Sequence, residues 1–326
     1  LDLTDLEAFS DGEGAVSVAL ASAQGILVWG ELDARTGLFR MLSQATGSGL
    51  LSFQTLSAPM PGLLWDDGTS KRAGGVVMSR AVANTVVQSL IYEDVYSDAG
   101  RGTFASVNPG GLAYLPNPGT CLPPGPVTLE SDPAGGSILY RVGTLAPVPL
   151  QLPAPPSRTL SSEWVSVDGG TVFRSPAGCL TAPTQLVASG TAAGARLSVA
   201  GTANDDRAYA YDTPTGRALT CLRSCGSGAC TNVGSESTGA SSELSIASAN
   251  AGSFVLRAER SAGEVILSRH DLAQGCGNGP TPVQELGRLT TGSSIRKFRP
   301  VMFGRRPGLL YLSTAGGPGV LRTFIP

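Results

Sequence analysis

The segment ILVWGELDARTGLFRML, residues 26–42, contains two apolar-rich runs joined by the turn sequence D-x-x-T-G. A second copy, RAYAYDTPTGRALT, occupies residues 207–220. An Asp side chain accepts hydrogen bonds from turn amides, and Gly adopts the positive φ that closes a hairpin. Both segments are therefore predicted to form β-hairpins.

Weaker copies of this hairpin recur along the whole chain. Each copy has a run of strand-forming residues, a turn with a closing glycine and a second run. The spacing of these glycines is close to the roughly 40–50 residues of a four-stranded propeller blade, apart from one long interval between the first two. The six closing glycines are Gly37, Gly111, Gly170, Gly216, Gly263 and Gly319.

The D-x-x-T-G hairpin resembles the turn between the second and third strands of pyrroloquinoline-quinone-type and related bacterial β-propellers. Six such hairpins predict an all-β, six-bladed β-propeller that occupies residues 1–326 as a single domain. The long interval is interpreted as one blade with an insertion at residues 58–84. Splitting that interval gives seven blades, and an irregular pair of β-sandwiches is the alternative fold.

The two ends of the chain are predicted to close the ring. The last repeat ends after three strands, and the alternating residues Leu1–Leu6 are expected to pair with Val320–Ile325 as the fourth. Such an overlap removes exposed sheet edges. In this register, strands such as Ala15–Ala21 line the axis, and these strands are largely uncharged apart from Glu93 and Asp94.

The composition restricts the class of protein. Charged residues make up 15% of the chain, below the roughly 25% of an average soluble protein. A net charge of −2 provides no basic field for a phosphate backbone, so nucleic acid is excluded as a partner. No run approaches the ~18–20 apolar residues of a transmembrane helix. The chain begins at Leu1 and not at methionine, as expected if an export signal has been removed.

An even number of cysteines in Gly-, Pro- and Ser-rich turns favours disulfides and an oxidising compartment. The cysteines are expected in the connections between third and fourth strands, on one face of the propeller. A zinc site is the alternative for the cluster at residues 221–230, but its spacing is not the paired C-x-x-C of structural zinc sites. The disulfide candidates are Cys121, Cys179, Cys221, Cys225, Cys230 and Cys276.

No catalytic group of residues is identified. A Ser-His-Asp hydrolase requires an imidazole, and His270 is the only histidine. It is expected to be a surface or half-buried structural residue. Residues 166–173 resemble the Asp-box of sialidase-type propellers, in which the box is a structural turn. No cofactor is predicted, although carboxylates at Glu93-Asp94, Asp205-Asp206 and Asp66-Asp67 are weak Ca²⁺ candidates.

Two irregular segments are the candidate recognition surfaces. The predicted insertion at 58–84 combines an aromatic residue with charges, a combination that suits a protein or glycan contact. Residues 144–158 are proline-rich and are expected to be an extended linker or a docking strip. The predicted binding residues of the insertion are Trp65, Asp66, Asp67, Lys71 and Arg72.

The leading functional hypothesis is a non-catalytic binding or assembly protein. It would be secreted, periplasmic or on the outer cell surface of a bacterium, and would use the propeller as a rigid platform for protein or glycan contacts. A carbohydrate-active propeller, either a lectin or a glycosidase-like enzyme, is the first alternative. A structural subunit of a surface appendage or filament is the second.

Overall fold

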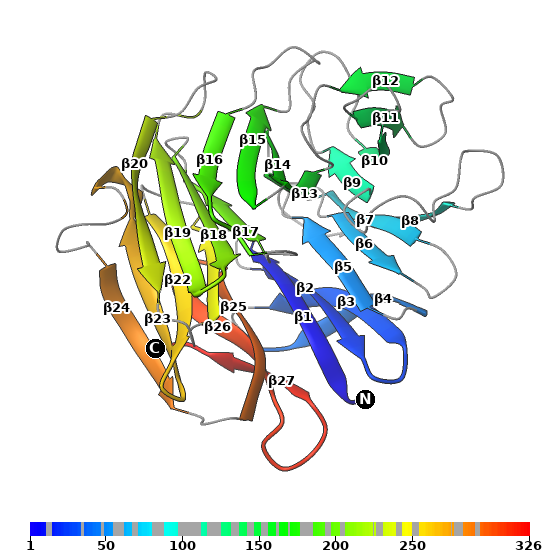
Figure 1. Ribbon diagram of the computed structural model, residues 1–326. Coiled ribbons are helices and arrows are strands. Elements are labelled where there is room, and N and C mark those ends of the chain that lie inside the picture. The colour runs from blue at the N-terminus through cyan, green and yellow to red at the C-terminus, as the bar shows by residue number, and fades with distance from the viewer. Residues whose placement is uncertain are drawn as a thin grey trace.

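The computed structural model is built of β-strands, with a single turn of 3₁₀ helix, η3 (Leu272–Gln274), among the described residues (Figure 1). None of the described residues forms a helix long and apolar enough to cross a membrane. The structure describes residues 1–10, 15–33, 36–46, 49–54, 62–66, 71–79, 88–96, 112–115, 125–131, 137–141, 147–150, 156–160, 163–168, 170–176, 185–192, 197–202, 206–223, 225, 231–238, 243–249, 254–274, 276, 283–290 and 294–326.

The described strands form seven antiparallel sheets, and each sheet consists of strands that are consecutive in the sequence. The first sheet contains β1 (Leu3–Ser10), β2 (Ala15–Ser22), β3 (Ile26–Asp33) and β4 (Phe39–Thr46). The second contains β5 (Gly49–Gln54), β6 (Gly62–Asp66), β7 (Lys71–Ser79) and β8 (Gln88–Tyr96). The third contains β9 (Leu112–Leu115), β10 (Gly125–Ser131), β11 (Ser137–Arg141) and β12 (Pro147–Leu150).

The remaining four sheets follow the same order along the chain. The fourth contains β13 (Pro156–Leu160), β14 (Glu163–Asp168), β15 (Thr171–Pro176) and β16 (Gln185–Ser189). The fifth contains β17 (Leu197–Gly201), β18 (Arg207–Thr213), β19 (Gly216–Arg223) and β20 (Thr231–Thr238). The sixth contains β21 (Glu243–Ser248), β22 (Phe254–Ser261), β23 (Glu264–Asp271) and β24 (Val283–Thr290). The seventh has β25 (Ile295–Phe303), β26 (Arg306–Ser313) and β27 (Val320–Phe324).

The hairpin chemistry predicted from the sequence is present in the first repeat. The Asp33 carboxylate accepts a hydrogen bond from the Thr36 amide at 3.0 Å, and the Gly37 amide donates to the Asp33 carbonyl oxygen at 2.8 Å. Positive φ is found at Gly37, Gly170, Gly216 and Gly263, as the closing role requires. Gly319 is described but does not have positive φ, so its predicted closing role is not confirmed, and Gly111 lies outside the described residues.

The two best copies of the hairpin occupy different places in their sheets, which the sequence did not reveal. The turn at Gly37 joins the third and fourth strands of the first sheet, whereas the turn at Gly216 joins the second and third strands of the fifth. The predicted pairing of Leu1–Leu6 with Val320–Ile325 is therefore wrong: β1 pairs with β2 through a short connection. The seventh sheet keeps three described strands, with β27 at its edge.

Residues 58–84 are not a simple insertion in the structure. They contain β6 and β7, the two central strands of the second sheet. The described sheets consequently outnumber the six predicted hairpins by one. The sequence did not predict this sheet because residues 66–70, which lead from β6 to β7, lack the complete D-x-x-T-G pattern.

The proline-rich segment 144–158 supplies β12 and the beginning of β13, which are edge strands of the third and fourth sheets. Proline has no amide hydrogen for a ladder and is confined to edge strands. Residues 147–150 and 156–158 of the segment are thus in extended strands, and residues 144–146 and 151–155 lie outside the described residues.

The described core lies between neighbouring sheets. Leu6, Val18 and Leu32 of the first sheet pack with Leu310 and Leu312 of the seventh. Comparable buried clusters join the fourth sheet to the fifth, the fifth to the sixth and the sixth to the seventh. Face-to-face packing of this kind buries the apolar side chains that alternate along each strand. It also brings β1 against β25, so that sheets at opposite ends of the sequence are neighbours (Figure 1).

Candidate functional site

A recess of about 380 Å³ lies beside the sixth sheet and is lined by Arg269, Asp271, Val283 and Gln284. Arg269 and Asp271 are alternate residues of β23, so their side chains leave the strand on the same face. Gln284 of β24 lies directly opposite Arg269 in the strand register. The recess therefore presents a cation, an anion and a neutral amide within one small volume.

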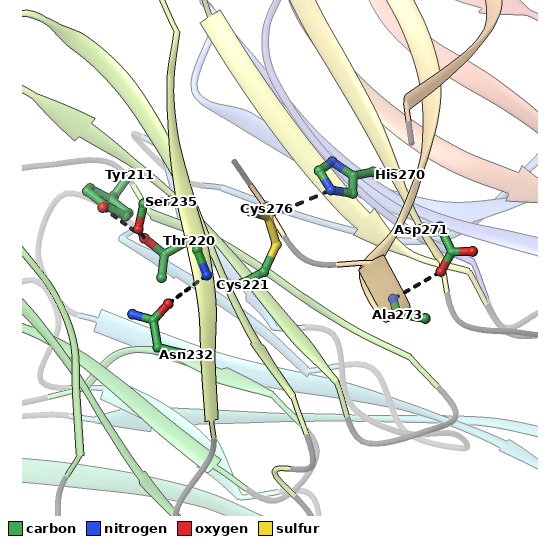
Figure 2. The surroundings of a disulfide bond; sticks show 10 residues. Tyr211, Thr220, Cys221, Asn232, Ser235, His270, Asp271, Ala273 and Cys276 are labelled. Atoms are coloured by element: carbon green, nitrogen blue, oxygen red, sulfur yellow. Dashed lines mark hydrogen bonds between the residues drawn. A yellow bond between two sulfur atoms is a disulfide. The ribbon is translucent and has the colours of Figure 1, made fainter. Parts of the chain in front are cut away.

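The two charged side chains of the recess are held in place by their neighbours. The Arg269 guanidinium lies over the Phe254 ring, 4.0 Å from its centroid. Such stacking restrains the orientation of the guanidinium. The Asp271 carboxylate accepts a hydrogen bond from the Ala273 amide at 3.0 Å (Figure 2). A preorganised donor and a preorganised acceptor are the requirements for recognising a polar ligand.

Behind the recess is a buried group of sulfur and imidazole side chains (Figure 2). Cys221 of β19 forms a disulfide with Cys276, which follows η3, and so joins the fifth sheet to the sixth. His270, the residue between Arg269 and Asp271, points to the other side of β23, and its Nε2 is 3.7 Å from the Cys276 sulfur. His270 is completely buried, so the expectation of a surface or half-buried histidine is wrong.

The cysteines agree only in part with their predicted positions. Cys225 and Cys276 lie between a third and a fourth strand, as expected, but Cys221 lies within β19 in an apolar core. Cys225 is also disulfide-bonded. No free cysteine is found among the described residues. Cys121, Cys179 and Cys230 lie outside them.

A strip of charges runs between β1 and β25, where the first and last sheets meet. Asp2 pairs with Arg296 at 3.1 Å, Asp5 pairs with Lys297, and Glu7 pairs with Arg299 at 2.6 Å. The innermost strands of these sheets are thus not uncharged, contrary to the expectation from the sequence. The error arose because the sequence predicted Ala15–Ala21 as the innermost strand of the first sheet, whereas Leu3–Ser10 is the strand that contacts the last sheet.

Arg299 is the most strongly held residue of this strip. Burial lowers the pKa of Arg299, but the charge and hydrogen bonds of Glu7, together with the charges of Asp5 and Glu243, raise it by more. The Nε and Nη2 groups of Arg299 donate to the two carboxylate oxygens of Glu7, at 3.0 and 2.6 Å. These carboxylates are committed to ion pairs, which suits a structural contact between sheets and not proton transfer to a substrate.

The binding residues predicted from the sequence lie on neighbouring strands of the second sheet. In the register of β6 and β7, Trp65 is opposite Arg72 and Asp66 is opposite Lys71. Asp67 lies outside the described residues. Glu93 and Asp94 belong to β8, which is an edge strand and not an axis-lining one. Of the other Ca²⁺ candidates, Asp206 is buried and Asp205 lies outside the described residues.

The recess was missed by sequence reasoning. Arg269 and Asp271 stand in the sequence S-R-H-D, which was considered only for its histidine. Phe254 and Gln284 come from two other strands and carry no local signal. The signal that could have indicated it is the alternation of side chains along residues 264–271, which places Arg269 and Asp271 on the face of the strand opposite His270.

Comparisons with known proteins identify the fold and not the family. No protein-family model matches the sequence, and no curated protein matches it. Among solved structures, the uncharacterized protein lmo1340 from Listeria monocytogenes EGD-e is similar over 100% of this chain and 96% of its own, with 9% identity and a TM-score of 0.50. AofleA from Arthrobotrys oligospora is similar over 100% and 84%, with 10% identity and a TM-score of 0.52.

A structure from a study of two prolyl endopeptidases matches 99% of this chain with 15% identity and a TM-score of 0.53. The match covers 47% of that longer chain. At such identities the likeness concerns the fold alone. The chain has a β-propeller-like fold of several antiparallel sheets, in agreement with the class predicted from its hairpins.

Proposed function

We propose that this chain is a non-catalytic binding protein whose recess beside β23 and β24 takes a glycan. The observation that carries the proposal is the stacked pair of Arg269 and Phe254 next to Asp271, within a recess of about 380 Å³. That volume is within the ordinary range for small-molecule sites, roughly 300–1,000 Å³. Sugar hydroxyls donate and accept hydrogen bonds at once, and an arginine, a carboxylate and an amide together satisfy both roles.

The scaffold in this proposal is a closed ring of seven blades. Support comes from the seven described sheets and from the contact of β1 with β25, which joins the first sheet to the last. A closed ring limits the movement of each sheet, so that the recess keeps its shape before the ligand arrives. Preorganisation reduces the entropy that binding must overcome.

A glycosidase activity has less support in the described residues. Glycosidases place two carboxyl groups about 5–10 Å apart around the scissile bond. The recess offers one carboxylate, Asp271, and the carboxylates between β1 and β25 are ion-paired. Binding without turnover is therefore the function proposed.

Replacement of Arg269 by Ala is expected to weaken glycan binding by about 10–100-fold, because a hydrogen bond to a charged group contributes about 1.5–3 kcal/mol. The labelled protein would first be screened on a glycan array, and the affinity for the best ligand would be measured by calorimetry. Arg322→Ala is the matched control, since Arg322 is an exposed arginine on β27 away from the recess. A wild-type protein that binds no glycan, or equal affinities for the two variants, would contradict the proposal.

The compartment proposed is the oxidising exterior or periplasm. Its support is the Cys221–Cys276 disulfide and the bonded state of Cys225. Mass spectrometry of the native protein after alkylation without reductant is expected to show no alkylated Cys221, Cys225 or Cys276. Complete alkylation of all six cysteines would exclude the secreted assignment.

A further inference from the structure

The chain brings together three metal-ligand side chains that the sequence keeps apart. Cys221 belongs to β19 of the fifth sheet and His270 to β23 of the sixth, whereas Cys276 lies in the connection between β23 and β24. Their donor atoms all lie within 4.8 Å of one another. The relative exposures are 0% for Cys221, 0% for His270 and 2% for Cys276. This Cys₂His cluster differs from the cluster at 221–230 considered from the sequence, since Cys225 is engaged in a separate disulfide.

The spacing of the donors suits a tetrahedral zinc ion. With Zn–S of about 2.3 Å and Zn–N of about 2.0 Å, tetrahedral coordination separates sulfur and nitrogen by about 3.5 Å. The observed distance between His270 Nε2 and the Cys276 sulfur is 3.7 Å. The Cα atoms of the two cysteines are 5.4 Å apart, so rotation of the Cys221 and Cys276 side chains is enough to open both sulfurs toward a shared ion.

The charge of such a centre matches its surroundings. Leu219, Val255 and Leu272 belong to the apolar cluster that encloses both cysteines. An isolated charge is expensive in such an environment. One Zn²⁺ with two thiolates and a neutral imidazole has no net charge, so the complete centre avoids this cost. His270 is the only histidine of the chain, which makes the imidazole specific to this site.

We propose that reduction of the Cys221–Cys276 disulfide converts this cluster into a Cys₂His zinc site. A dithiol gives two electrons and two protons to the disulfide, becomes a cyclic disulfide itself, and leaves two protein thiols. Zn²⁺ then replaces the two thiol protons, which are released to solvent, and accepts the Nε2 lone pair of His270. The fourth tetrahedral position is filled by water or another small ligand. The junction of the fifth and sixth sheets is thus held by a covalent bond when oxidised and by a metal ion when reduced.

Cobalt is the probe for the first test, because tetrahedral Co²⁺ thiolates give intense visible bands and a sulfur-to-metal charge-transfer band. The full chain would be reduced with a phosphine under argon and titrated with Co²⁺, with near-UV circular dichroism to follow tertiary structure. We expect one equivalent to produce both bands and Zn²⁺ to abolish them. The oxidised protein is expected to give neither band.

The variant His270→Gln tests whether the site is the one proposed. Loss of a residue that only orients a metal ligand costs about 10–100-fold in affinity, so loss of the ligand itself should cost at least about 100-fold. Cys225→Ser is the matched control and is expected to keep the bands, because Cys225 lies outside the cluster. Bands that persist in His270→Gln, or that vanish in Cys225→Ser alone, would overturn the assignment.

A second measurement removes any dependence on how the variant folds. The single histidine gives one set of imidazole signals in an NMR spectrum of the wild type. We expect Zn²⁺ to shift these signals in the reduced protein and to leave them unchanged in the oxidised one. Unshifted signals, or a reduced chain that stays unfolded when Zn²⁺ is added, would overturn the proposal.

Discussion

The variant Gly234→Ala is expected to lose most of the stability of the protein. Gly234 lies in β20, where a bulge interrupts the pairing with β19 next to Cys221. A Cβ at this position would overlap the Cys276 carbonyl oxygen, which is backbone and cannot rotate away. The φ of 122° adds strain for any residue with a side chain. We expect the free energy of unfolding to fall by more than about 4 kcal/mol, a size that single substitutions reach only through mechanisms such as severe overpacking or backbone strain. The Tm should be lower by about 8 °C or more.

The variant Gly190→Ala is the control that separates these two causes. Gly190 also has a positive φ, of 80°, but no atom lies within 4 Å of the site of its Cβ. It should therefore report the backbone strain alone, about 1 kcal/mol. Calorimetric Tm values give the comparison, and the rate of disulfide reduction by a mild dithiol adds a second readout: Gly234→Ala is expected to make the Cys221–Cys276 disulfide more accessible to the reductant. Equal Tm values for the two variants would show that the close approach of β20 to Cys276 is not required.

The repeat and its class were predictable because hairpin chemistry is local. Asp33, Thr36 and Gly37 close a turn by contacts within five residues, and the same pattern at residues 212–216 establishes the repeat. Alternation of apolar residues then places strands on either side. Such information is enough for an all-β chain of antiparallel sheets, since every strand pairs with its neighbour in sequence.

The position of each hairpin within its sheet was not predictable by the same means. A hairpin between second and third strands has the same local sequence as one between third and fourth strands. The distinction depends on which strand lies innermost, and that is decided by packing between sheets, such as the contact of Leu6 with the seventh sheet. The sequence assigned the wrong strand of the first sheet to the innermost position. This one error gave the wrong partner for the N-terminal strand and missed the charges between β1 and β25.

The two candidate sites were hidden for a related reason. The recess takes its lining residues from β23 and β24 and a stacking partner from β22, and the Cys₂His cluster combines residues associated with two sheets. Cysteine count predicted disulfides correctly as a class, but fifteen pairings are open to six cysteines. Only the packing of the fifth sheet on the sixth selects Cys221 and Cys276 as partners.

Loss of the ion pair between Glu7 and Arg299 is expected to cause the second largest decrease in the stability of the protein, after Gly234→Ala. This pair joins β1 to β25, and its side chains are only 16% and 18% exposed. Removal of one partner leaves the other charge poorly solvated, which costs about 3 kcal/mol in a partly buried pair. Arg299→Leu also leaves Asp5 and Glu243 with less compensating charge, since both interact with Arg299. A Tm lower by about 6 °C is expected in calorimetry.

Arg288→Leu is the matched control, because Arg288 also contacts two carboxylates, Glu264 at 2.7 Å and Glu285 at 2.9 Å, but is 46% exposed. Solvent screens such a pair, and a much smaller loss of stability than for Arg299→Leu is expected. The double variant Glu7→Leu/Arg299→Leu should be more stable than Arg299→Leu alone, because no orphaned carboxylate remains. If Arg299→Leu is no worse than Arg288→Leu, the ion pair does not stabilise the contact of β1 with β25. If it is worse and the double variant recovers, that contact rests on apolar packing of the first sheet against the last, with the ion pair specifying their alignment.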